Sequence, residues 1–100
     1  MKRECNQLGQ IRRFADNHAD AARELVRWHK TARSCHWHDI LEVRMLFPDA
    51  DQWGNLLIFN IRHNSFRLIV KVDFQANLIL VKEFLTHTQY MRGGWKKWAK

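Results

Sequence analysis

The 100-residue sequence contains one proline, four glycines and two cysteines, and it has no long apolar segment. No apolar run approaches the roughly 18 residues that span a bilayer, so a membrane protein is not expected. The N-terminal stretch "MKRECNQLGQIRRF" has no apolar core, so no signal peptide is expected and the cytoplasm is the expected location. Cys5 and Cys35 are typical of free thiols in a reducing compartment.

Acidic side chains are scarce in the second half of the chain, and none follows Glu83. Residues 1–50 carry nine basic and seven acidic side chains, whereas residues 51–100 carry eight and three. This concentration of positive charge favours a polyanionic ligand such as nucleic acid, or an acidic protein partner. The alternative is a basic protein that binds no nucleic acid.

Most patterns that indicate a catalytic or metal site are also missing. The sequence has no glycine-rich phosphate loop, Ser/His/Asp arrangement or carboxylate pair, and its second half has too few acids for a two-metal nuclease. The stretch "CHWH" at residues 35–38, with His29 nearby, lacks the second ligand pair of a structural zinc site. No metal or other cofactor is therefore predicted.

The first half has the periodicity of amphipathic helices. Apolar residues recur at helical spacing over residues 7–16, 19–33 and 39–46, and Pro48 ends the third helix. The stretch "DNHAD" separates the first two helices. The residues expected to face inward from the third helix are Ile40, Val43 and Leu46.

The second half has the alternation of β-strands. Strands are predicted over residues 55–61, 66–74 and 78–85, with a hairpin turn at residues 62–65. Helices followed by an antiparallel meander indicate an α+β domain, with the N-terminal helices packed on one face of a small sheet. Without repeats or linkers, one domain over residues 1–100 is expected.

Four residues are candidates for catalysis. Arg67 and Lys71 are four residues apart on one strand and so share a sheet face about 13 Å apart, where they could stabilise a phosphate. His87, just past the last strand, suits acid–base chemistry, and Tyr90 could stack on a base or meet a phosphate. The alternatives are a solvated strand face, a histidine that caps a turn and a partly buried tyrosine that anchors the tail.

The tail "RGGWKKWAK" and the hairpin turn supply candidates for RNA binding. In the tail, lysines would contact phosphates while Trp95 or Trp98 stacks on a base. Alternatively, the tryptophans pack on the core and the lysines are solvated. The predicted RNA-binding residues are Arg62, His63, Arg92, Trp95, Lys96 and Lys97, with Lys100 as a further phosphate contact.

Several stretches together resemble the HigB toxin family, which are RelE-like messenger-RNA interferases of bacterial type II toxin–antitoxin systems. They are "FADNHADAARELVRWHKTAR", "EVRMLFPDADQWGNLLIFNI", "NSFRLIVKVDF" and "FLTHTQYMRGGWKK". The resemblance rests on the Phe47-Pro48-x-Ala50 element, the "FNI…N-FRL" hairpin and the "LTH-xx-Y" ending. The sequence departs from the family in the polar start "MKREC", and in Met91, where the family commonly has an acidic residue.

The resemblance implies a RelE-like microbial RNase fold and a metal-independent endoribonuclease that cuts messenger RNA on the translating ribosome. It implies attack of a ribose 2′-hydroxyl on the adjacent phosphate, with proton transfer by His87 and assistance from Tyr90. Arg67 and Lys71 would stabilise the phosphorane. The implied partners are messenger RNA, the ribosome and a HigA-like helix-turn-helix antitoxin, through which alone the protein would reach operator DNA.

Two other functions remain open from the sequence. One is a non-catalytic module that uses the same basic, aromatic surface to bind RNA, DNA or an acidic protein. The other is a degenerate toxin that keeps the fold and the antitoxin but has lost cleavage, a reading that Met91 keeps open.

Overall fold

A computed structural model of the protein describes residues 8–63 and 65–99. Its centre is a four-stranded antiparallel sheet in which strand order follows chain order. The strands are β1 (Asp51–Trp53), β2 (Leu56–Ile61), β3 (Phe66–Asp73) and β4 (Leu78–Thr86). The three predicted strands are confirmed, but β1 was not predicted. It has only three residues, all exposed, and so shows no apolar alternation.

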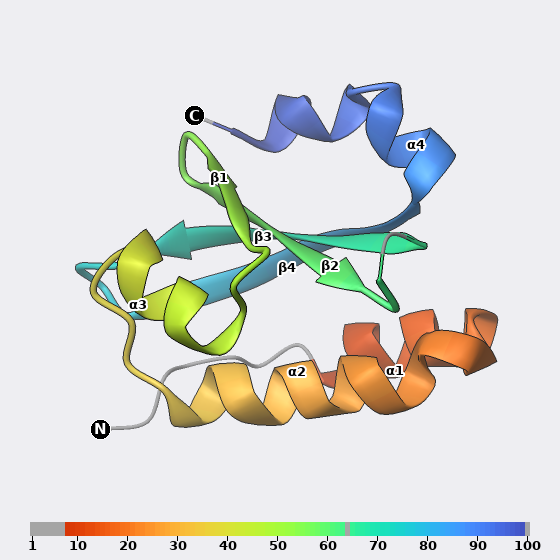
Figure 1. The fold of residues 1–100 in the computed structure, drawn as a ribbon, viewed down its shortest axis with the longest axis horizontal. Helices are drawn as coiled ribbons and strands as arrows, with labels where there is room; N and C mark the ends of the chain where they lie inside the picture. The colour runs from red at the N-terminus through yellow and green to blue at the C-terminus, as the bar shows by residue number, and fades with distance from the viewer. Residues whose placement is uncertain (1–7, 64, 100) are drawn as a thin grey trace.

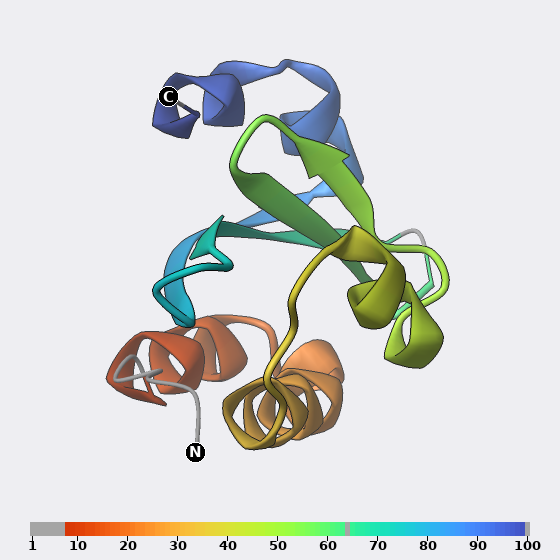
Figure 2. The same ribbon diagram turned by 90° about the vertical axis from the view of Figure 1, so that its left-hand side faces the viewer.

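Helical segments lie on both sides of the sheet. The sheet separates α1 and α2 from the C-terminal α4 and η2, as Figures 1 and 2 show. These segments are α1 (Leu8–Asn17), the 3₁₀ turn η1 (Ala19–Ala21), α2 (Ala22–Ser34), α3 (Ile40–Leu46), α4 (His87–Met91) and the 3₁₀ helix η2 (Gly94–Trp98). The N-terminal helices and the α+β class are confirmed, whereas the helical form of the tail was not predicted.

The main core lies between the N-terminal helices and the nearer sheet face. Trp28 of α2 meets Phe59 of β2 edge-to-face with ring centres 5.3 Å apart, and Phe14 of α1 stacks on Phe84 of β4 at 5.6 Å. Burial of a large apolar side chain contributes roughly 1.5–3 kcal/mol relative to leaving it exposed. The predicted inward face of β3 is confirmed, since its core residues are Phe66, Leu68, Val70 and Val72, with Phe74 packed against them.

The inward face of α3 was predicted only in part. Val43 is buried, but Leu46 is 52 % exposed. The helix ends at Leu46, and Phe47 has an extended φ of −130°. The Phe47 ring lies 6.1 Å from Trp37 and 5.1 Å from Phe59, measured between ring centres. Phe47 therefore fills the position that the helical spacing assigned to Leu46.

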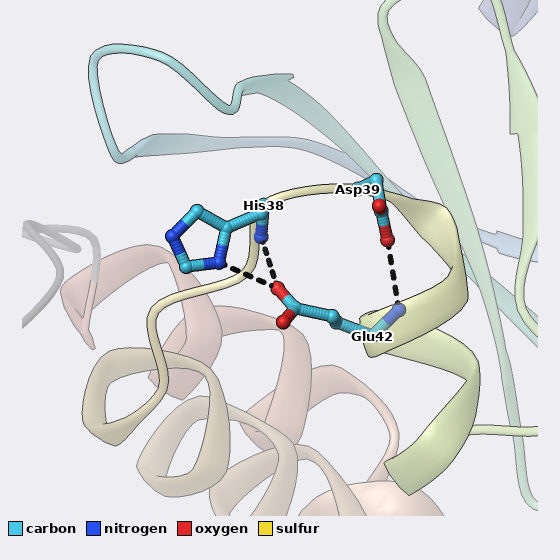
Figure 3. A network of polar contacts seen from close by, with 3 residues as sticks. All are labelled: His38, Asp39 and Glu42. Atoms are coloured by element: carbon cyan, nitrogen blue, oxygen red, sulfur yellow. Dashed lines mark hydrogen bonds and ion pairs between the residues drawn. The ribbon is translucent and has the colours of Figure 1, made fainter.

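Side-chain hydrogen bonds define the start of α3 (Figure 3). An Asp39 carboxylate oxygen accepts a hydrogen bond from the Glu42 backbone N–H at 3.1 Å, an N-cap contact. The Glu42 carboxylate accepts bonds from the backbone N–H of His38 and from its ring Nδ1, the latter at 2.8 Å. These bonds, the backbone bond first, hold the pKa of Glu42 below its usual value of 4.5.

None of the helices in the described part of the chain is long and apolar enough to cross a membrane. Cys35 is partly buried and packs against the main core, whereas Cys5 lies outside the described residues.

We predict that Glu42→Gln lowers the stability of the protein slightly at pH 7 and less at pH 3. A carboxyl whose pKa is lowered by folding stabilises the folded state above its unfolded pKa, and that contribution is lost as the pH falls through the folded value. The effect is small because the pair is solvated. Thermal unfolding of both proteins at the two pH values measures it, with Asp49→Asn as the control. Equal differences at both pH values would contradict the prediction.

Candidate functional site

The C-terminal segment covers the sheet face that points away from α1 and α2. Trp95 is 4 % exposed and packs in a second apolar cluster with Leu56, Ile58 and Ile69. Gly93 joins α4 to η2 with a φ of +78°, a left-handed conformation that favours glycine. The centre of this face is therefore apolar, and Trp95 withdraws its side chains from water.

Arg67 lies beside this second cluster and is only 9 % exposed. Its guanidinium carbon is 5.1 Å from the centre of the Tyr90 ring, and its Nη1 donates a hydrogen bond to the Phe66 carbonyl at 3.2 Å. The Tyr90 ring is itself stacked on Trp95, with ring centres 5.1 Å apart and planes 7° from parallel. A permanently charged group is thus held in one orientation against an aromatic face.

A capping box begins α4 directly after β4. The Thr86 hydroxyl accepts a hydrogen bond from the Gln89 N–H at 3.2 Å, and the Gln89 side-chain oxygen accepts one from the Thr86 N–H at 3.0 Å. The N–H of His87 donates to the Ser65 carbonyl at 3.1 Å, which ties the start of α4 to the β2–β3 turn. The exposed His87 side chain is therefore carried by a backbone with a defined position.

Three of the four predicted catalytic residues lie at one end of the sheet. Arg67 pairs with Leu85, which is two residues before His87, and Tyr90 of the same short helix contacts Arg67. Lys71 lies apart from them, about 13 Å along β3, where it lines a different hollow of about 480 Å³. The structure therefore assembles a smaller group than the sequence predicted.

The predicted RNA-binding residues of the tail divide by exposure. Arg92, Lys96 and Lys97 are exposed, whereas Trp95 is buried. The alternative prediction, in which Trp95 packs on the core and the lysines are solvated, is thus confirmed for this tryptophan. Lys100 lies outside the described residues.

The β2–β3 turn presents its basic residues differently. Arg62 and His63 are exposed, with left-handed φ angles of 54° and 58°. The Arg62 guanidinium forms an ion pair with Asp20 at 2.6 Å, and its backbone N–H donates to the Glu24 carboxylate at 2.9 Å. This side chain therefore faces acidic groups of the N-terminal helices, which weakens its prediction as an RNA contact.

Trp53 was missed by the sequence analysis. Trp53 is the last residue of β1 and is 48 % exposed. Its ring meets that of Trp95 edge-to-face, with ring centres 6.1 Å apart. The Lys96 ammonium is 4.3 Å from the centre of the Trp53 ring. The available signal was the stretch "DQWGN", where a glycine turn follows a tryptophan, but one aromatic residue before a turn does not indicate a strand.

The site combines cations, aromatic rings and one exposed histidine. Within residues 8–63 and 65–99, no group of three His, Cys, Asp or Glu side chains is placed to hold a metal ion. Arginine and lysine suit phosphates, aromatic rings suit nucleobases, and a histidine can transfer a proton near neutral pH. The arrangement is thus chemically suited to an anionic polymer that carries planar rings.

Comparison with known families decides the kind of protein. A family model described as HigB_toxin, the RelE-like toxic component of a toxin-antitoxin system, matches residues 21–93. The chain belongs to the HigB toxin family. The match includes α2, all four strands and α4, so the resemblance and the RelE-like α+β fold are confirmed. A search of curated proteins found no match.

Membership makes this chain the toxin of a toxin–antitoxin system and implies an antitoxin as its partner. The matched region contains Arg67, Lys71, His87 and Tyr90, whereas η2 lies entirely beyond it. The roles of the individual site residues stay predictions.

We predict that Trp95→Ala destabilises this HigB-family chain strongly. Removing a buried indole typically costs about 3–5 kcal/mol, and here it would also remove the ring on which Tyr90 stacks. Trp53→Ala, at an exposed position, should cost at most about 1 kcal/mol. Urea unfolding of both variants measures the difference. Similar midpoints would mean that Trp95 does not hold the C-terminal segment on the sheet.

Proposed function

We propose that this toxin is a metal-independent endoribonuclease that cleaves messenger RNA on the translating ribosome. The observation that carries the proposal is the Arg67–Tyr90 contact at the end of the sheet where His87 is exposed. The surrounding charge supports an RNA ligand, because Arg92, Lys96 and Lys97 are exposed nearby and no acidic residue follows Glu83 in the sequence. Family membership supports a toxic activity of the RelE-like type.

The proposed reaction is an intramolecular transesterification of RNA. A base removes the proton of a ribose 2′-hydroxyl, the 2′-oxygen bonds to the adjacent phosphorus, and the bond from phosphorus to the 5′-oxygen breaks. The leaving 5′-oxygen takes up a proton. The products are a 2′,3′-cyclic phosphate and a 5′-hydroxyl, and no metal or oxidant is consumed.

We assign proton transfer to His87, with Tyr90 positioning the groups around it. The Arg67 guanidinium would stabilise the phosphorane, since a preoriented cation needs little reorganisation as charge develops. Lys71 and Arg67 are separated on β3 by Ile69, which belongs to the cluster around Trp95. We therefore assign Lys71 to a neighbouring phosphate of the RNA and not to the reacting one.

The proposed partners follow from the same reading. The antitoxin would be a HigA-like helix-turn-helix protein, and the toxin would reach operator DNA only through it. Messenger RNA would be the substrate, and the ribosome would present it.

The second candidate function is a non-catalytic module that binds RNA or an acidic protein. It is favoured by one observation, which is that the Arg67 guanidinium is largely buried against Tyr90 and so exposes little charge to a phosphate. A degenerate toxin is the same case with antitoxin binding retained.

We predict that His87→Ala lowers cleavage by about 10²- to 10⁴-fold, the usual contribution of a general acid or base. Mapping of 5′ ends on a translated messenger RNA, with programmed ribosomes and with naked RNA, measures it. His36→Ala, which removes an exposed histidine distant in sequence from the site, is the matched control and should cut like the wild type.

The outcomes separate the candidates. New 5′-hydroxyl ends that require ribosomes and disappear only with His87→Ala support the proposal. Cuts that survive His87→Ala keep the endoribonuclease and remove His87 from its chemistry. If the wild type binds RNA but never cuts it, the binding module is correct.

A further inference from the structure

Within the described residues 8–63 and 65–99, Trp53 is the only phenylalanine, tyrosine or tryptophan whose side chain is well exposed. An indole left 48 % exposed adds little to folding, and the exposed ring lies on the same side of the sheet as the C-terminal segment. Trp95, one of the two tryptophans that the sequence suggested for stacking, has no free face of this kind because it is buried. An aromatic surface for a ligand is therefore present, but on a different residue.

The Trp53 ring is held in place by its surroundings. It pairs in register with Leu56, which is fully buried in the second cluster, across a tight turn at Gly54. Gly54 has a φ of +58°, and its carbonyl accepts a hydrogen bond from the Gln52 side chain at 3.1 Å. The edge contact with Trp95 limits the remaining freedom of the ring. A preorganised ring loses little entropy when a ligand stacks on it.

A hollow of about 240 Å³ opens beside this ring. Its lining residues are Trp53, Tyr90, Met91, Gly93, Trp95 and Lys96. This lining contains one cation and no carboxylate. Lys96 reaches over both indoles, with its ammonium 4.3 Å from the centre of the Trp53 ring and 5.8 Å from that of Trp95. Asp51, which precedes Trp53 on the strand, has its charge matched by Arg44 at 3.5 Å.

The hollow is also next to the proposed catalytic group. Tyr90 contributes to its wall and contacts the Arg67 guanidinium. An RNA strand whose scissile phosphate lies at Arg67 would therefore place one of its neighbouring bases in the hollow. An aromatic wall with a single ammonium group matches a planar base joined to a phosphate better than it matches an aliphatic side chain.

We propose that this hollow is a subsite for one unpaired nucleobase of single-stranded RNA. The base stacks on Trp53, and Lys96 moves from the ring to the adjoining phosphate. The inference deepens the proposed function and rests on it for the identity of the ligand. Because stacking on an indole uses the face common to all bases, the subsite contributes affinity and positioning with little dependence on sequence.

The test is equilibrium binding of a short, fluorescein-labelled 2′-O-methyl RNA of mixed sequence, which the proposed reaction cannot cleave because it has no free 2′-hydroxyl. Trp53→Ala should weaken binding roughly 5- to 150-fold, the range for loss of one base–aromatic stack, whereas Trp53→Phe should retain most of it. Leu41→Ala, which removes an exposed apolar side chain on α3, is the control and should bind like the wild type.

A second measurement ties the loss to a base. One nucleotide at a time is replaced by an abasic residue, and binding is measured with wild type and Trp53→Ala. At one position, the abasic substitution in the RNA should lower the affinity of the wild type as much as the Trp53→Ala substitution in the protein does. The same abasic RNA should bind Trp53→Ala no more weakly than the intact RNA does. A thermal unfolding midpoint of Trp53→Ala well above the temperature of the binding assay shows that the loss is not one of folding.

Equal binding by wild type and Trp53→Ala overturns the subsite, as does an abasic loss that is the same in both proteins. No RNA binding by the wild type, or binding of an acidic peptide through Trp53 instead, also overturns it. The proposed function fails separately. If Trp53 carries a base but no RNA is cut, the subsite stands and the endoribonuclease fails. If RNA cleavage depends on His87 but is unchanged by Trp53→Ala, the endoribonuclease stands and the subsite fails.

Discussion

The packing of Trp95 in one apolar cluster with Leu56, Ile58 and Ile69 is the interaction on which the rest of this structure depends. A four-stranded sheet with helices on one side would leave Leu56, Ile58 and Ile69 in water, and Trp95 covers them from the other side. This brings Tyr90 over Arg67 and brings Lys96 over Trp53. The same contact that completes the fold thus arranges the aromatic and basic side chains of the candidate site.

A cation that is buried against an aromatic ring suits a task that needs a fixed orientation more than it needs exposure to solvent. Arg67 has little contact with water, and its hydrogen bond and its ring contact restrict how it can move. Such a group is suited to charge that develops briefly at one point, and poorly suited to holding RNA at long range. In the proposed function, the exposed lysines of η2 would supply the long-range attraction for RNA instead, so that binding and chemistry would fall to different residues.

The sequence predicted those elements whose apolar pattern has a clear period. Helices α1 to α3 and strands β2 to β4 fall within a few residues of their predicted positions, and the alternation of Phe66, Leu68 and Val70 predicted the correct inward face. Leu46 was misplaced because Phe47, just outside the helix, competes for the same space. No local pattern shows that competition.

The candidate site was less predictable, because it depends on where the tail returns. The capping box of Thr86 and Gln89 is a local signal that would have indicated α4. The burial of Trp95 and the exposure of Trp53 have no local signal, since either tryptophan could have covered Ile69. Their assignment depends on the left-handed turn at Gly93, which sets the direction of η2.

The order of synthesis determines when the C-terminal segment can cover the sheet. The strands, including Arg67 and Trp53, leave the ribosome before α4 and η2, because the chain is made from its N terminus. Until Tyr90 and Trp95 emerge, the nascent chain exposes an apolar sheet face, and Arg67 has no aromatic ring beside it. The candidate site is therefore completed only after the C-terminal segment has emerged and folded over the sheet.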